Sequence, residues 1–143
     1  MGLDEGEARE LNAIAGVLEA LALSVAPAFD SPAIAQLRVA SESFRYSGED
    51  ASSLAVADHD FHSRLVERCG DERLLATLAP VRAALYRWQA AITPVPAETA
   101  RAADEHDAIV AALARGDHIS AAQRVRKHVA GGLPGLLGAL ERR

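Results

Sequence analysis

The feature that most constrains the fold is a series of apolar stripes at helical spacing, separated by proline, glycine and capping residues. The first stripe recurs every three or four residues, which places its side chains on one face of an α-helix. No segment alternates apolar and polar residues beside an Asn-Gly type of turn, so no β-hairpin is expected. The residues of this first stripe are Leu11, Ile14, Ala15, Leu18, Leu21, Ala22 and Val25.

Capping and breaking residues set the expected helix boundaries. Ser31 should cap the second helix, with Pro32 at the first helical position, and Asp71 and Asp117 should cap the fourth and sixth. Pro80 should kink or divide the fourth helix. The expected helices cover residues 7–26, 31–46, 50–69, 71–92, 98–115, 117–129 and, as a last turn or two, 136–143.

Length and composition exclude several classes of protein. The 143 residues suit a single all-α domain over residues 1–143, and short loops favour antiparallel packing of its helices. A net charge of −5 and a pI of about 5.5 argue against a nucleic-acid-binding surface. Cys69 is the single cysteine, so no internal disulfide can form. The sequence has no long apolar run and no basic signal-peptide start, so we expect a soluble, cytoplasmic protein.

Residues 58–62, Asp-His-Asp-Phe-His, are the most informative segment for function. On a helix at ~100° per residue, Asp58 and His62 lie in the middle of an apolar stripe. An ionised carboxylate on such a face is costly unless it is paired or binds a metal. Because Asp58 and His62 are four residues apart, their side chains can reach the same point. The other members of the stripe are Leu54, Phe61, Leu65 and Cys69.

Two further histidines fall on apolar helix faces. His106 lies on the inward face of the fifth helix, and His128 flanks that of the sixth. Three imidazoles and one carboxylate from three helices can meet inside a bundle and hold a metal. We therefore expect one divalent transition metal per chain, Zn²⁺ in the first place, or Ni²⁺, Mn²⁺ or Fe²⁺, bound by Asp58, His62, His106 and His128.

Simpler interpretations of these residues stay open. An inward histidine is more often a hydrogen-bonded core residue than a ligand, and Asp58 and His62 could form a pair within their helix. His59 lies at the edge of the stripe, and His118 follows a cap in a first turn, where exposure is expected. Cys69 is interpreted as a buried structural thiol.

The ordered set of motifs resembles the FCD domain, the effector-binding domain of GntR-type transcription regulators of the FadR subgroup. The resemblance spans nearly the whole chain. It rests on Leu18, Glu19, Asp58, Phe61, His62, Leu65, Leu74, Leu75, Glu105, His106, Ile109, Ala112, Leu113, Gly116, Asp117, Ala121, Ala122, Lys127 and His128.

The resemblance implies an antiparallel bundle of about six or seven helices. It also implies that Asp58, His62, His106 and His128 hold a metal, which anchors a small carboxylate metabolite in a cavity. Effector binding would change domain or dimer geometry, and a winged helix would report that change to DNA. This chain begins at the first helix of the domain itself, so we expect it not to bind DNA alone.

Two positions depart from the family pattern. Ala15 stands where the family often has an arginine, and Asp71 stands where it has asparagine. On the fourth helix, Arg82 and Gln89 lie near the apolar stripe and could replace the missing arginine, Arg82 as a carboxylate clamp. Alternatively, Arg82 could extend to solvent. Three arginines on polar faces are interpreted as solubility charges: Arg87, Arg101 and Arg124.

Three functions compete at this point. The first is a metal-anchored metabolite sensor, the regulatory part of a transcription factor. The second is a metal-dependent enzyme, although no inward second carboxylate, lysine or serine is placed as a general base, so we expect no enzyme. The third is a metal-free helical interaction domain. A homodimer is expected from the family, and Val17 and Trp88 hint at additional apolar faces.

Overall fold

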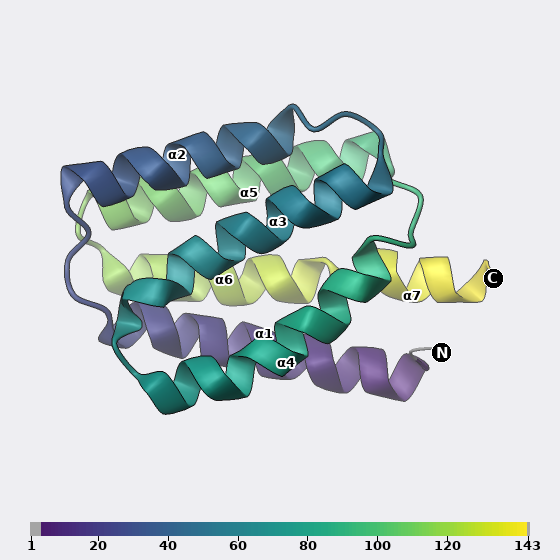
Figure 1. The fold of residues 1–143 in the computed structure, drawn as a ribbon, viewed down its shortest axis with the longest axis horizontal. Coiled ribbons are helices and arrows are strands. Elements are labelled where there is room, and N and C mark those ends of the chain that lie inside the picture. The colour runs from purple at the N-terminus through teal and green to yellow at the C-terminus, as the bar shows by residue number, and fades with distance from the viewer. Residues whose placement is uncertain (1–3, 143) are drawn as a thin grey trace.

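The computed structural model describes residues 4–142, and all the regular structure in that range is helical (Figure 1). This confirms the expected all-α class. No helix in the described range is long and apolar enough to span a membrane. The elements are α1 (Glu5–Val25), α2 (Ser31–Arg45), α3 (Ala51–Val66), a 3₁₀ turn (Glu67–Cys69), α4 (Glu72–Gln89), α5 (Pro96–Ala114), α6 (His118–Gly131) and α7 (Leu133–Glu141).

Six helices form a closed ring, in which each packs against two neighbours. The order around the ring is α1, α6, α5, α2, α3, α4 and back to α1. The colour gradient along the chain shows that neighbours in the ring run in opposite directions (Figure 1). Helix α7 continues beyond α6 and packs on α1 and α6. The expected antiparallel bundle is therefore confirmed, and the inward faces of six helices share one interior.

Aspartate side chains cap the N-termini of α1, α2, α3, α4 and α6. Asp71 accepts a hydrogen bond from the Leu74 backbone N–H at 3.0 Å, and Asp117 caps α6 in the same way, as the sequence predicts. At α2 the cap is Asp30, one residue earlier than expected, and Ser31 is the first helical residue. Asp30 satisfies a free backbone N–H at the N-terminus, a role that aspartate and serine perform about equally well.

Helix α4 is continuous through Pro80, so the expected division does not occur. Proline removes one backbone hydrogen bond, but buried leucines anchor the helix on both sides of it, Leu78 before and Leu85 after. The packing of both halves of α4 against the ring thus outweighs the free-energy cost of placing Pro80 inside the helix. Helix α7 starts at Leu133, three residues before the expected position.

The interior of the ring holds a compact apolar core. Several buried polar and charged side chains interrupt it, and because a buried charge is costly, each must be paired or bind a ligand. The most deeply buried apolar residues are Leu23, Leu37, Phe61, Leu65, Leu78, Ile109, Val110, Leu113 and Val125. The buried polar residues are Asn12, Glu19, Ser41, Asp58, His62, Arg82, His106 and His128.

The two residues that hinted at additional apolar faces behave differently. Trp88 is 8% exposed and belongs to the core, so the hint it gave of a second apolar face is wrong. Val17 is 46% exposed and lies on the outer face of α1 with Ile14, Leu21 and Val25. Ile14, Leu21 and Val25 of the predicted first stripe are therefore exposed, because the buried face of α1 is formed by Ala8, Asn12, Ala15, Gly16, Glu19, Ala22 and Leu23. Within the described chain, α1 is thus apolar on two sides.

Candidate metal centre

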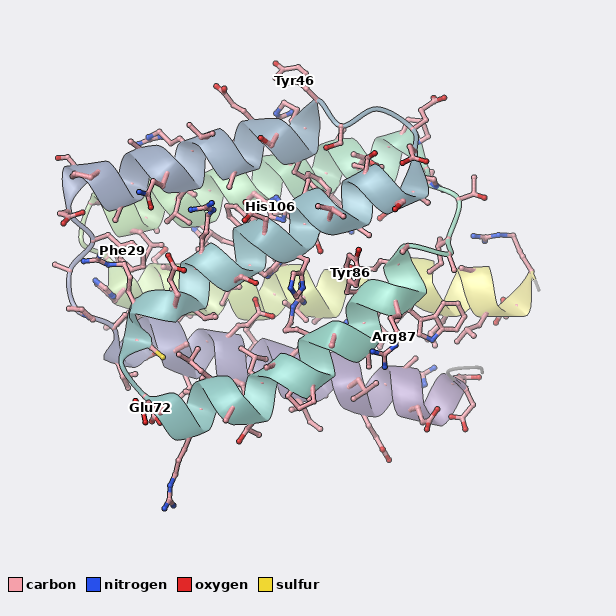
Figure 2. All side chains as sticks on the ribbon, in the orientation of Figure 1. Phe29, Tyr46, Glu72, Tyr86, Arg87 and His106 are labelled. Carbon is pink, nitrogen blue, oxygen red and sulfur yellow. The ribbon has the colours of Figure 1, made fainter. Side chains whose placement is uncertain are left out.

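The four predicted ligands come together inside the ring. Helix α3 contributes Asp58 and His62, α5 contributes His106, and α6 contributes His128. One ligand atom from each lies within 4.8 Å of the others. His106 is seen in the interior, between the helices (Figure 2). Atoms that share a Zn²⁺ at about 2.0–2.2 Å lie at most about 4.4 Å apart, so the four atoms nearly fit one ion.

Asp58 is the anionic centre of the group. Its Oδ1 lies 3.4 Å from His62 Nε2 and 3.3 Å from His106 Nε2, and its Oδ2 lies 3.6 Å from Arg82 Nη2. Burial alone would raise the pKa of Asp58, but the neighbouring His62 and His106 outweigh burial and hold the pKa well below its ordinary value. Asp58 therefore remains a carboxylate and can act as a metal ligand.

His106 is held as a neutral imidazole between two aromatic rings. Phe61 stacks on it with ring centroids 4.1 Å apart, and Phe44 meets it edge-on at 4.7 Å. Its Nε2 atom lies 3.3 Å from Asp58 Oδ1, and its Nδ1 atom is buried without a hydrogen-bond partner. Burial lowers the pKa of His106, which favours the neutral ring. A neutral imidazole keeps a lone pair on one ring nitrogen, so His106 can act as a metal ligand.

His62 is oriented by a buried carboxylate from α1. Its Nδ1–H donates to Glu19 Oε1, which leaves Nε2 facing the centre, and Arg82 Nη1 lies 3.3 Å from Glu19 Oε2. Burial raises the pKa of Glu19, but the charges of His62 and Arg82 together lower it below its ordinary value. Burial lowers the pKa of His62, but Glu19 outweighs it and raises that pKa to about 9.

His128 is oriented in the same way by Glu105. Its Nδ1–H donates to Glu105 Oε1 at 2.6 Å, and Arg101 Nη1 donates to both oxygens of Glu105 at 2.8 Å. Burial, followed by the charge of His62, lowers the pKa of His128 to about 4, so its ring is neutral. Arg101 is therefore part of the support of the site, and its interpretation as a solubility charge is wrong.

Two series of paired side chains thus support the centre, and each runs from an arginine through a glutamate to a histidine. They are Arg82–Glu19–His62 and Arg101–Glu105–His128. Metal-binding histidines usually donate their second ring N–H to a carboxylate, which fixes the tautomer and raises the basicity of the ligand. The roles of Glu19 and Glu105 were not predicted from the sequence. Glu19 lies on the buried face of α1 with Ala8, Ala15 and Ala22, beside the predicted apolar stripe and not on it. The available signal was that both glutamates belong to the motifs that carry the family resemblance.

A cavity of about 480 Å³ opens beside the centre. Its inner end is lined by Asp58, His62 and His128, and Arg82 and Gln89 of α4 also lie on its wall. Arg82 is 8% exposed, its Nε has no hydrogen-bond partner, and its Nη atoms lie 3.3 and 3.6 Å from carboxylate oxygens. These distances exceed the ~2.7–2.9 Å of a strong charge-assisted bond, so Arg82 retains donor capacity.

The two histidines left out of the prediction lie outside the cluster. His59 is partly buried, and its ring centroid lies 5.3 Å from that of Tyr86. His118 is also partly buried rather than exposed, because its Nδ1–H donates to the Leu23 carbonyl at 2.9 Å. Cys69 is buried and free. None of these three side chains belongs to the group that could hold a metal.

The sequence of the chain matches the family model of the FCD domain over residues 10–131. The chain therefore belongs to the FCD domain family. Among solved structures, it resembles a transcriptional regulator, a GntR family member, from Pseudomonas syringae pv. tomato str. DC3000, with a TM-score of 0.82 and 16% identity. That match covers 98% of this chain and 59% of the regulator's chain, so this chain spans little more than half of that protein. A search of curated protein sequences finds no match.

Proposed function

We propose that the chain is a metal-anchored sensing domain for a small carboxylate metabolite, within a GntR-type regulator of the FadR subgroup. The observation that carries this proposal is the convergence of Asp58, His62, His106 and His128 beside a cavity. A set of three histidines and one carboxylate suits a divalent transition metal, with Zn²⁺ as the first candidate and Ni²⁺, Mn²⁺ and Fe²⁺ as alternatives.

The bound metal would supply a Lewis-acid anchor for the carboxylate of the metabolite. The N–H groups of Arg82 that are not fully used by Glu19 and Asp58 would donate to the same carboxylate. Gln89 would contact the ligand further along the cavity wall. Four protein ligands leave coordination positions open if the metal is five- or six-coordinate. The site then binds its ligand without transforming it, because Asp58 is itself a metal ligand and Glu19 is held by His62.

Effector binding could be signalled through the helices that the site connects. The centre and its supports connect α1, α3, α4, α5 and α6, so a ligand that fits one arrangement of these helices better than another shifts the population towards it. We propose that a homodimer transmits this shift to a winged-helix domain that contacts DNA. The exposed apolar side of α1 is consistent with a covered face in such a dimer.

The test compares two aspartates of the same motif. Asp58→Ala should abolish Zn²⁺ binding and the Zn²⁺-dependent binding of acetate, a minimal carboxylate probe followed by ligand-observed NMR. Asp60→Ala is the matched control, because Asp60 pairs with Arg64 on the same helix and belongs to no candidate ligand group. Retention of both metal and acetate binding by Asp58→Ala would refute the proposed site.

A further inference from the structure

The cavity wall beyond the metal end is mainly apolar. Side chains from α2, α3, α4, the α4–α5 connector, α5 and α7 build it. A pocket of this size and lining typically buries most of its ligand and discriminates through few polar contacts. The main apolar contributors are Phe44, Leu54, Leu85, Ile92, Val95 and Leu136.

Helix α7 leaves open space at the outer end of the cavity. Gly132, Gly135 and Gly138 all line the cavity, and their spacing of three residues places them along one side of the helix. A Cβ atom added at Gly135 would meet nothing within 4 Å. Helix α7 also lies beyond the residues matched by the family model. A Cβ atom at Gly132 or Gly138 would instead meet Val129 O at 3.5 Å or Arg142 Nη1 at 3.2 Å, so the open space lies at Gly135.

Hydrogen-bonding side chains form the smaller part of this wall, and besides the metal ligands they are Asn12, Arg82, Gln89, Thr93, Glu98, Thr99, Arg101 and Arg142. Arg82 is nine-tenths buried at the inner end with Nε unpartnered, and Gln89 Oε1 is buried without a partner. At the outer end, Glu98 and Arg101 are paired with each other at 2.9 Å. The Thr99 hydroxyl bonds to a backbone carbonyl. A ligand with many hydroxyl groups would lose hydration here and recover few hydrogen bonds.

We infer that the effector is a carboxylate with an apolar body, and that it is not a polyhydroxylated acid. This inference rests on the proposed function, because the carboxylate end is placed at the metal and Arg82. The apolar body extends from there past Leu85 towards the α4–α5 connector and the open side of α7. Gln89 can satisfy one polar substituent of the ligand.

A homologous series of carboxylates tests the inference on the Zn²⁺-loaded protein. We expect affinity to rise from acetate through butyrate to hexanoate by about two- to fourfold per methylene, as burial of each CH₂ predicts. Gluconate, which has the same number of carbons as hexanoate, should bind at least tenfold more weakly. A flat series, or gluconate binding as tightly as hexanoate, would overturn the inference.

A variant of α7 at the outer end of the cavity tests where the apolar body of the ligand lies. Gly135→Leu should fill the space beside α7 and weaken hexanoate binding about tenfold or more, while acetate and Zn²⁺ binding stay unchanged. Unchanged acetate and Zn²⁺ binding also shows that the variant is folded. Glu141→Leu is the control, because it adds a leucine to an exposed position of α7 that does not line the cavity. Equal hexanoate affinity in Gly135→Leu and the wild type would contradict the placement.

The same titrations without metal separate the two proposals. Loss of acetate binding on removal of Zn²⁺ supports metal anchoring, whatever the effect of chain length. If hexanoate binds equally well without metal and chain length still raises affinity, the apolar-body inference stands and metal anchoring is refuted. If acetate binding needs metal but chain length has no effect, only the further inference is refuted.

Discussion

At the scale of single residues, the charges buried in the centre balance when His62 is protonated. Two buried carboxylates then face two buried cations, and His106 and His128 are neutral because burial lowers their pKa values. A divalent metal that displaces the proton of His62 leaves one surplus positive charge, which a monocarboxylate neutralises. The carboxylates are Glu19 and Asp58, and the cations are His62 and Arg82.

Glu19→Gln should weaken Zn²⁺ binding about 10- to 100-fold, which is the usual cost of losing a carboxylate that orients a metal-binding histidine. An amide in place of Glu19 also removes the charge that raises the pKa of His62, so NMR titration of metal-free protein should show a lower pKa for His62. Glu10→Gln, on the exposed side of α1, should change neither quantity. Unchanged Zn²⁺ affinity in Glu19→Gln would show that Glu19 only fills space.

Metal binding near pH 7 should release about one proton per chain. The pKa of His62 is about 9 in the metal-free protein, so its imidazolium must lose a proton to ligate, whereas His128, with a pKa of about 4, is already neutral. Apparent Zn²⁺ affinity should therefore rise about tenfold per pH unit between pH 7 and 9. Calorimetric titration in buffers of different ionisation enthalpy measures the released proton. Affinity independent of pH over this range would contradict His62 as a ligand.

Helical spacing was sufficient to predict which ligands face inward. Asp58, His62, His106 and His128 could be assigned because the direction of a side chain on a helix depends only on nearby residues. The carboxylate partner of His62 lies 43 residues away, on a helix whose contact with α3 no local pattern reveals. Arg101 was misassigned for the same reason.

At the scale of elements, capping and periodicity predicted all the helices, and the errors lie at their ends. The N-cap of α2 differs by one residue, because Asp30 and Ser31 are comparable capping residues in adjacent positions. Pro80 was expected to kink or divide the fourth helix, but α4 continues through it, because Leu78 and Leu85 pack on either side of the proline. Local signals fix where helices form, and packing decides how far they extend.

Asp71→Ala should destabilise the protein by about 1 kcal/mol, because the Leu74 N–H at the start of α4 loses its acceptor. For a domain of this size, that corresponds to a fall of about 3 °C in Tm. Asp71→Asn should be nearly neutral, since asparagine caps a helix about as well as aspartate. Thermal unfolding followed by circular dichroism measures both, and equal losses in the two variants would refute the capping role.

At the scale of the whole molecule, the closed ring is the feature that the sequence could not provide. Antiparallel packing of neighbouring helices follows from short loops, but ring closure depends on α1 packing against both α4 and α6. A metal held by α3, α5 and α6 would cross-link three members of this ring. Metal binding and stability of the fold should therefore be linked.

Chelation should lower the melting temperature of the metal-loaded protein. At a free Zn²⁺ concentration about 100 times Kd, the folded state gains about 2.7 kcal/mol, which corresponds to roughly 5–10 °C. Differential scanning calorimetry before and after EDTA treatment measures the change, and Asp58→Ala should show none. An unchanged melting temperature in the wild type would favour a metal-free helical domain.

The most direct test of the central claim is the metal content of protein purified without chelator and without a nickel affinity tag. Elemental mass spectrometry should find about one equivalent of a divalent transition metal per chain, as expected for a site in which Asp58, His62, His106 and His128 converge. A protein that remains metal-free after reconstitution with Zn²⁺, Ni²⁺ and Mn²⁺ would contradict the claim. Asp58, His62 and His128 would then line a cavity whose ligand is bound by side chains alone, and His106 would be a buried core residue.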